Sequence, residues 1–337
     1  PPQPPEKPAT NLKVHFIDVG QGDCILIEDG TSAMLIDAGN PENGPGIVSY
    51  IKNLGIQKLN FVLATHPHAD HIGGMADVIN AFPVEKIIMP KVAHTTRTFE
   101  NLLLTIQNKG LKITAPVPGT EYKLGDASFT ILAPNSNSYE DLNNYSVVVK
   151  LNYGSTSFLF TGDAEATSEN EILARGYNVK ADVLKVGHHG STSSTTDKFL
   201  DAVSPQYAVI CVGAGNSYGH PAPATLLKLA ERGIKIYRTD EAGTIVATSD
   251  GKSISFNKQP SSVNINSTTS KKTDNSRVAG DNNTNTASDD ITVYITKTGT
   301  KYHRENCSSL RSSRIPISLS EAKQRGYEPC KICKPPQ

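Results

Sequence analysis

Short apolar runs alternate with polar turns along most of this chain, and several of the turns contain histidine or aspartate. The runs predict strands, whereas apolar residues at helical spacing predict helices between them. The predicted strands lie within residues 12–28, 33–36, 60–64, 85–89, 111–133, 147–151, 157–160, 183–186, 207–212, 234–237, 244–248 and 253–256. The predicted helices cover residues 45–54, 77–82, 97–109, 165–175, 195–202 and 223–232.

Each half of this region starts with strands and continues with strand–helix units. This order predicts an α/β fold in which two sheets pack face to face and the helices lie outside. Polar residues at the ends of apolar strands are where α/β proteins place their chemistry, so the strand ends are the places to search for a site.

Composition divides the 337 residues into four segments. We expect a disordered proline-rich lead over residues 1–11, a main domain over residues 12–258, a flexible polar linker over residues 259–290 and a small domain over residues 291–337. The linker is rich in Ser, Thr, Asn and Asp, and its few aliphatic side chains cannot offset the entropy lost on ordering.

Charge is distributed unevenly although the formal net charge is zero, which excludes an overall basic field. Residues 291–337 carry nine Lys/Arg against three Asp/Glu, whereas residues 1–258 carry 21 against 26. No apolar run is long enough to span a bilayer, and the five cysteines do not form a disulfide framework. The proline-rich start is typical of a spacer left after removal of an export signal, although an arbitrary sequence boundary gives the same pattern. We therefore expect a secreted or cell-surface bacterial protein.

The densest chemical feature is a cluster of three histidines and one aspartate that follows the apolar run of residues 60–64. Imidazole and carboxylate are ligands of divalent transition metals, and four such groups cannot enter an apolar core without a metal or a dense hydrogen-bond network. The spacing allows two neighbouring metals, with His66 and His68 on one and Asp70 and His71 on the other. The alternative is a solvated histidine-rich loop, which leaves the later strand-end residues unexplained.

Later strand ends offer the remaining ligands. Asp163 is the candidate for a carboxylate that bridges the two metals, and either His188 or His189 supplies a further imidazole; we favour His188 because it comes first after its strand. Asp37, at the end of an earlier strand, is expected to orient a ligand histidine through its second nitrogen. His220 precedes a proline turn and either contacts a charged group of the substrate or is a structural turn residue.

These motifs resemble the metallo-β-lactamase superfamily, whose metal motif matches His66-x-His68-x-Asp70-His71. More narrowly, residues 12–257 are similar to the soluble hydrolase domain of ComEC-type competence proteins. The segments that carry this similarity are Phe16–Asp23, Leu35–Gly39, Thr161–Glu165, Val186–Ser191 and Tyr218–Pro221. The resemblance implies a four-layer αββα sandwich with metals at one edge of the sheets, and a metal-dependent nuclease that acts on DNA.

One position departs from the superfamily pattern. Most members with two metals have a further histidine shortly before the bridging aspartate, whereas this chain has Asn143-Asn144-Tyr145-Ser146 there. Asn144 is then a weak oxygen ligand or a substrate contact. Fewer imidazoles weaken the preference for Zn²⁺, so Mn²⁺ is also a candidate for one or two ions. Of the spare histidines, His94 lies in a polar loop and His15 in a strand, where it is expected to be packed or hydrogen-bonded.

The small C-terminal domain carries a second candidate site. His303-x₃-Cys307 and Cys330-x₂-Cys333 supply four nitrogen and sulfur ligands, the set of a closed structural Zn²⁺ site. A domain this small needs such a staple to fold. A redox pair at Cys330 and Cys333 is the alternative, but it leaves the other two residues without a role. The tail resembles Ada-like metal-binding modules, and its basic residues either grip phosphates or form a solvated face.

Three functions compete for this chain. The first is a metallo-hydrolase, a phosphodiesterase or nuclease in which a metal-activated water attacks DNA, Asp70 or Asp163 orients that water, and His189 and His220 neutralise the phosphoryl oxygens. The second is an esterase of small or wall-attached substrates such as a phosphocholine ester or a lactone. The third is a non-catalytic metal-binding module that tethers nucleic acid or cell wall.

Overall fold

The computed structural model describes residues 10–263 and, in the C-terminal part, residues 292–296, 299–304, 307–310, 313–319, 322 and 327–335. Most of the expected lead and residues 264–290 of the expected linker lie outside the described residues. The chain divides into two units, Pro1–Lys271 and Lys272–Gln337. Among the described residues, no helix combines the length and the apolar character needed to cross a bilayer.

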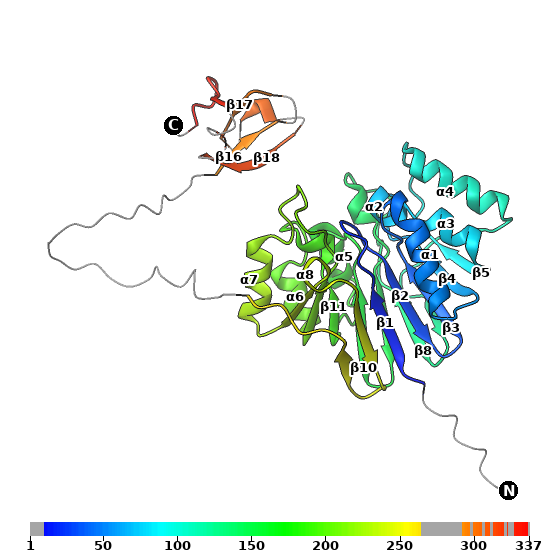
Figure 1. Ribbon diagram of the computed structural model, residues 1–337. Helices are drawn as coiled ribbons and strands as arrows, with labels where there is room; N and C mark the ends of the chain where they lie inside the picture. Colours follow the sequence, from blue (N-terminus) through cyan, green and yellow to red (C-terminus); the bar gives the residue numbers. More distant parts are fainter. Residues whose placement is uncertain are drawn as a thin grey trace, which may run out of the picture. The chain divides into compact units, whose positions relative to one another are not determined.

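The first sheet of the main unit has eight strands in the order β15-β14-β1-β2-β3-β4-β5-β6 (Figure 1). Its strands are β1 (Leu12–Phe16), β2 (Ile25–Asp29), β3 (Ser32–Ile36), β4 (Leu59–Leu63), β5 (Val84–Ile88), β6 (Ile113–Thr114), β14 (Ile245–Ser249) and β15 (Ile254–Phe256). Strands β3 to β6 run parallel, so their carboxyl ends lie at the same edge of the sheet.

The second sheet has seven strands in the order β13-β12-β11-β10-β9-β8-β7. Its strands are β7 (Glu121–Leu124), β8 (Ala127–Ile131), β9 (Val149–Tyr153), β10 (Thr156–Phe160), β11 (Val183–Lys185), β12 (Tyr207–Ile210) and β13 (Lys235–Arg238). Strands β10 to β13 are parallel, so this sheet also has one edge where four carboxyl ends meet.

Apolar side chains arrange these elements in four layers. One core cluster fills the space between the sheets and includes Phe16, Phe129 and Phe158, all fully buried. A second cluster joins the first sheet to α1 (Gly44–Asn53), α3 (Met75–Ala81) and α4 (Arg97–Asn108), and a third joins the second sheet to α5 (Ala166–Ala174), α6 (Asp197–Val203) and α7 (Pro223–Glu231). Figure 1 shows these two helical layers on opposite sides of the sheets. The central strands are buried on both faces, which explains their nearly continuous apolar sequences.

Two short helices were not expected from the sequence. α2 (Ala69–Ile72) replaces the expected polar turn after β4, and α8 (Thr239–Ala242) lies between β13 and β14. α2 matters for the site because it carries Asp70 and His71. Four residues are too few for apolar periodicity to reveal a helix.

The C-terminal unit is small, and its described residues form two strand pairs. β16 (Thr292–Ile295) pairs antiparallel with β18 (Ile315–Ser318), and β17 (Lys301–Tyr302) pairs parallel with β19 (Glu328–Pro329). Among the described residues, the core of this unit is a small group of side chains around Val293, Tyr302 and Ala322, and a core of this size gives little stability by apolar burial alone.

Candidate metal centre

The two parallel edges bring the chemical residues of the main unit together. In the first sheet, β3 leads to Asp37 and β4 leads to the histidine cluster. In the second sheet, β10 leads to Asp163 and β11 leads to the histidine pair. Residues far apart in sequence therefore meet because the carboxyl ends of parallel strands share an edge.

Close backbone contacts fix the loop after β4. The Ala38 amide donates to the His71 carbonyl at 2.7 Å, and the Gly74 amide donates to the Ala38 carbonyl at 3.0 Å. A Cβ at Gly74 would lie 2.6 Å from that carbonyl oxygen, so only glycine fits there. The histidine cluster is thereby anchored to the end of β3, as a preformed site requires.

His71 is the centre of the cluster and is fully buried. Its Nδ1 lies 2.8 Å from Asp37 Oδ2, and its Nε2 lies 3.2 Å from Asp163 Oδ2 and 3.8 Å from Asp70 Oδ2. Asp37 also accepts hydrogen bonds from the Thr65 amide at 2.8 Å and the Thr65 hydroxyl at 2.7 Å, so its carboxylate is held in place. Burial lowers the pKa of His71, but the surrounding carboxylates outweigh it and raise that pKa well above its usual value. The same carboxylates attract a divalent cation.

His66 and His68 lie beside His71. His66 Nε2 is 2.9 Å from His68 Nδ1, and His66 Nδ1 is 3.1 Å from the Thr65 hydroxyl. Burial lowers the pKa of His66 well below its usual value, and His71 lowers it further. His66 is therefore neutral near pH 7, the form in which imidazole binds metal.

The histidine pair after β11 differs from the expectation. His189 is buried, and its Nε2 lies 3.3 Å from Asp70 Oδ2 and 3.4 Å from Asp163 Oδ2. Its Nδ1 donates to the Cys211 carbonyl at 2.8 Å, which leaves Nε2 free as a ligand atom. His188 is more exposed, and its Nε2 lies 3.9 Å from Asp163 Oδ2. The geometry thus favours His189 as the ligand, whereas the sequence favoured His188.

The reason lies in the backbone. His188 and His189 both have positive φ angles, 48° and 53°. This left-handed turn sends the second imidazole into the cluster and leaves the first at the rim, where Nδ1 lies 3.2 Å from Glu165 Oε1. Position after a strand end therefore did not indicate which side chain faces the metal centre.

Three buried atoms test whether this cluster fits a metal. His71 Nε2, His189 Nε2 and Asp163 Oδ1 have no hydrogen-bond partner although they are shielded from solvent. Buried polar atoms without partners are costly and require an explanation, which a bound cation provides. The potential ligand atoms of His66, His71 and Asp163 lie within 4.8 Å of one another, and so do those of Asp70, His71 and His189. The residues therefore fit a cation in two overlapping groups that both contain His71, and His66 Nε2 faces His68 Nδ1 at 2.9 Å. Because His71 Nε2 has a single lone pair, it can bind one ion at a time.

The Asn144 side chain hydrogen-bonds to the backbone at the start of α5. Its Oδ1 accepts hydrogen bonds from the Glu165 amide at 3.3 Å and the Ser168 amide at 3.1 Å, at the start of α5. Its side chain therefore satisfies the exposed donors of a helix start, as a cap does. Asn143 instead lines the metal cavity, with Nδ2 3.5 Å from His188 Nδ1.

The metal cluster opens into a cavity of about 360 Å³. Its lining residues include Asp70, Asp163, both histidines of the pair after β11, and the previously spare His94, whose ring centroid lies 5.9 Å from that of His68. His220 also lines it. Burial lowers the pKa of His220 to about 4, helped by His188, so His220 is neutral near pH 7. It can exchange hydrogen bonds with a ligand without adding positive charge to the cavity.

Two buried charged residues beside the cluster, Lys185 and Asp23, were not identified from the sequence. The Lys185 side chain is fully buried, its Nζ contacts Asp23 Oδ2, and it donates to the Gly162 carbonyl at 3.1 Å. It also lies 3.8 Å from Asp163 Oδ1, while Asp23 Oδ1 lies 3.5 Å from His189 Nδ1. This ion pair therefore contacts two of the candidate ligands, Asp163 and His189. The sequence feature that could have identified this ion pair is the lysine within the apolar run of β11.

The C-terminal unit brings its four candidate ligands together. Their ligand atoms all lie within 4.8 Å of one another: His303, Cys307, Cys330 and Cys333. The Cys307 and Cys330 sulfurs are 3.9 Å apart, too far for a disulfide bond of about 2.05 Å. Two sulfurs at tetrahedral positions, each about 2.3 Å from Zn²⁺, would be about 3.8 Å apart. The cluster therefore fits a closed tetrahedral site.

A two-sheet sandwich with outer helices and a His/Asp cluster at the shared sheet edge defines a metal-dependent hydrolase fold. The chain belongs to the metallo-beta-lactamase superfamily, which matches residues 17–214. This confirms the family and the fold class expected from the sequence, and a divalent metal as the expected type of cofactor.

Three curated relatives are competence or recombination proteins. ComE operon protein 3 of Bacillus subtilis is 31% identical over 251 residues, 69% of this chain and 32% of the relative. Competence protein ComA of Neisseria gonorrhoeae is 29% identical, with 72% of this chain and 33% of the relative covered. Recombination protein 2 of Haemophilus influenzae is 30% identical, with 69% and 28% covered. The chain spans about a third of the length of these relatives.

Proposed function

We propose that the main unit is a metal-dependent phosphodiesterase that cleaves DNA. The observation that carries the proposal is the set of buried ligand atoms without hydrogen-bond partners, on His71, His189 and Asp163, which opens into a solvent-accessible cavity. The similarity to competence and recombination proteins favours nucleic acid as the substrate.

The proposed metal ligands are His66, His71, Asp163, Asp70 and His189, with His68 beside the first of these. Paired divalent cations, Zn²⁺ or Mn²⁺, lower the pKa of water and stabilise charge on phosphoryl oxygens. The protein contributes orientation: Asp37 fixes the His71 ring, and the Cys211 carbonyl fixes the His189 ring.

His188 is the proposed proton carrier at the cavity rim. Its Nδ1 contacts Glu165 Oε1 at 3.2 Å and the Ser193 hydroxyl at 3.1 Å, so the ring is held from one side. Its Nε2 faces the cavity near Asp163 and is placed to give a proton to the leaving oxygen. Neutral His220, whose ring centroid is 5.4 Å from that of His188, hydrogen-bonds to the substrate without adding charge.

Cleavage of labelled single- and double-stranded DNA with added Mn²⁺ or Zn²⁺ tests the proposal. Asp163→Ala should abolish cleavage and reduce metal content, whereas Asp126→Ala, at an exposed turn between β7 and β8, should leave both unchanged. Equal cleavage by Asp163→Ala and wild type would show the mechanism to be wrong. Turnover of small phosphodiesters, phosphocholine esters or lactones without any cleavage of DNA would favour the esterase instead. Binding of DNA without turnover under every metal would favour the non-catalytic module.

For the C-terminal unit we propose one structural Zn²⁺ held by His303, Cys307, Cys330 and Cys333. The geometry of the four ligand atoms supports it, and so does the small apolar core, which leaves the fold dependent on an added constraint.

A further inference from the structure

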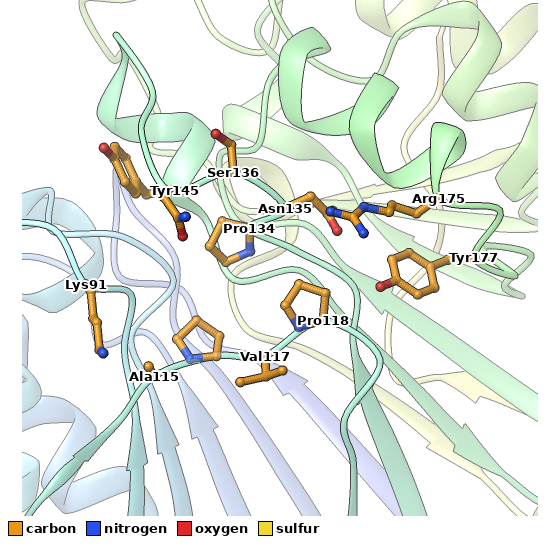
Figure 2. Close-up of a pocket in the computed structure, with 12 residues that line it drawn as sticks. Lys91, Ala115, Val117, Pro118, Pro134, Asn135, Ser136, Tyr145, Arg175 and Tyr177 are labelled. Carbon is orange, nitrogen blue, oxygen red and sulfur yellow. The ribbon is translucent and has the colours of Figure 1, made fainter.

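A second cavity, of about 390 Å³, lies beside the metal cavity and has no role in the proposed chemistry (Figure 2). Its wall combines two cations, two tyrosines, prolines and side-chain amides. The lining residues used below are Lys91, Pro116, Pro118, Pro134, Tyr145 and Arg175.

The two cavities share two walls. The short 3₁₀ helix Leu142–Tyr145 contributes Asn143 to the metal cavity and Tyr145 to the second cavity. The segment after β5 likewise contributes His94 to the metal cavity and Lys91 to the second. The two cavities therefore adjoin the same two segments of the chain.

The second cavity favours negative charge. Its lining contains no Asp or Glu, and among the described residues neither Lys91 nor Arg175 forms an ion pair. By contrast, Arg232 and Arg238 each pair with two carboxylates. Figure 2 shows Lys91 and Arg175 on opposite sides of the cavity, with the Arg175 guanidinium directed inward. Two cations left without ion pairs around one hollow attract an anionic ligand there, although the domain is slightly acidic as a whole.

The cavity wall is also preorganised. Three prolines line the cavity and restrict the backbone angles of its wall: Pro116, Pro118 and Pro134. Tyr145 packs edge-on against Tyr139 at 5.0 Å between ring centroids, and its hydroxyl accepts a hydrogen bond from the Tyr139 amide at 3.1 Å. Rigid walls reduce the entropy lost on binding.

We infer that this cavity binds the phosphates of a nucleic-acid strand next to the phosphate held at the metal centre. The inference rests on the proposed function and deepens it, because Lys91 and Arg175 would give preference to a polymer over small esters. The basic residues of the C-terminal unit are not part of this proposed site.

The test uses the full chain and the double variant Lys91→Ala/Arg175→Ala. Both side chains are exposed, so the fold should be retained. The matched control is Lys52→Ala/Lys180→Ala, which removes two exposed lysines, one near the end of α1 and one before β11, away from the edge that holds the site. Binding of a fluorescent single-stranded oligonucleotide is measured with chelator present, at salt from 50 to 200 mM.

Each phosphate contact to a single strand contributes a slope of about 0.7 in log affinity against log salt. Losing two contacts should lower the slope by about 1.4, so the variant's relative loss of affinity should shrink roughly sevenfold between 50 and 200 mM salt. The control pair should keep the wild-type slope. With metal, the cavity variant should lose kcat/KM on the oligonucleotide but keep that on bis(p-nitrophenyl) phosphate.

An unchanged slope in the cavity variant overturns the inference, even where the wild type cleaves DNA. An equal loss on the small ester overturns it as well, because the cations would then act through the metal centre. If the cavity variant loses affinity for a sulfated polysaccharide to the same extent as for the oligonucleotide, the cavity binds polyanions in general and the preference for nucleic acid is overturned. A reduced slope in a protein without nuclease activity keeps the strand subsite and rejects the proposed function alone.

Discussion

Replacing Lys185 by methionine tests the buried ion pair behind the metal centre most directly. The substitution keeps a long unbranched side chain in β11 but removes the cation. Burial raises the pKa of Asp23, but Lys185 and the neighbouring histidines outweigh it, and the pKa of Asp23 is lowered. Without Lys185, Asp23 keeps a buried negative charge and loses its main partner.

The expected loss follows from the burial of both partners. The side chains of Lys185 and Asp23 are 0% and 1% exposed, so water cannot replace the lost partner. Removing one member of a buried pair costs about 3–5 kcal/mol in the free energy of unfolding, because the other charge is left uncompensated. Asp23→Asn in the same chain removes that charge, so the double variant should be more stable than Lys185→Met alone.

Lys150→Met is the matched control within the same sheet. Lys150 is 8% exposed and donates to the carbonyl of Asn178 at 3.2 Å. Asn178 is exposed, so its carbonyl can turn to water, and the expected loss is about 1 kcal/mol.

Urea unfolding with chelator present, followed by circular dichroism and tyrosine fluorescence, measures these differences without a contribution from metal binding. If Lys185→Met unfolds within about 1 kcal/mol of wild type, or no more easily than Lys150→Met, the ion pair does not stabilise the site in the way described here.

Three further predictions concern separate parts of the chain. Cys330→Ser should lower the metal content by one ion and leave DNA cleavage intact, whereas Asp163→Ala should remove metal from the main unit. Metal analysis of both variants assigns the ions to the two units. Loss of main-unit metal from Cys330→Ser would contradict separate sites. Asn144→Ala should lower the free energy of unfolding by about 1 kcal/mol without changing metal content, because its amide caps α5; loss of a metal would restore the ligand interpretation. Hydrogen bonding to His15 lowers the pKa of Glu28, so the stability that ionised Glu28 gives the fold is present above its unfolded-state pKa and is lost as pH falls through its folded-state pKa. The stability advantage of wild type over Glu28→Gln should therefore shrink on acidification from pH 7 to pH 3. An advantage independent of pH would exclude this linkage.

The fold could be predicted because its central strands are buried on both faces and therefore have apolar sequences. The runs 33–36 and 183–186 predicted β3 and β11 to within one residue. His15 was expected to be hydrogen-bonded, and it contacts the Tyr50 hydroxyl at 2.8 Å and Glu28 Oε1 at 3.0 Å. The short helix α2 escaped prediction because tertiary contacts at Gly74, rather than its own periodicity, fix it.

Sequence identified the residue types of the site better than their orientation. Choosing between His188 and His189 required two consecutive positive φ angles, which nothing in the sequence around them specifies uniquely. Asn144 and Asn143 are a similar pair: one caps a helix and the other lines the cavity. Adjacent identical residues carry no signal about which one faces a site, because a single turn of backbone decides it.

The missing histidine near Asn144 leaves the two cation positions unequal. Close to His66 Nδ1 the structure has the Ser146 hydroxyl at 3.4 Å, which also accepts a hydrogen bond from the Asp163 amide at 3.1 Å and so holds the backbone of Asp163. The position of His71, Asp70 and His189 instead combines two imidazoles with a carboxylate, and Asp163 lies within 3.4 Å of both imidazoles. We expect a cation to gain more from these donors, which include Asp70, than from the imidazoles of His66 and His68, whose facing nitrogens are 2.9 Å apart. Stepwise chelation should therefore empty the His66 side first.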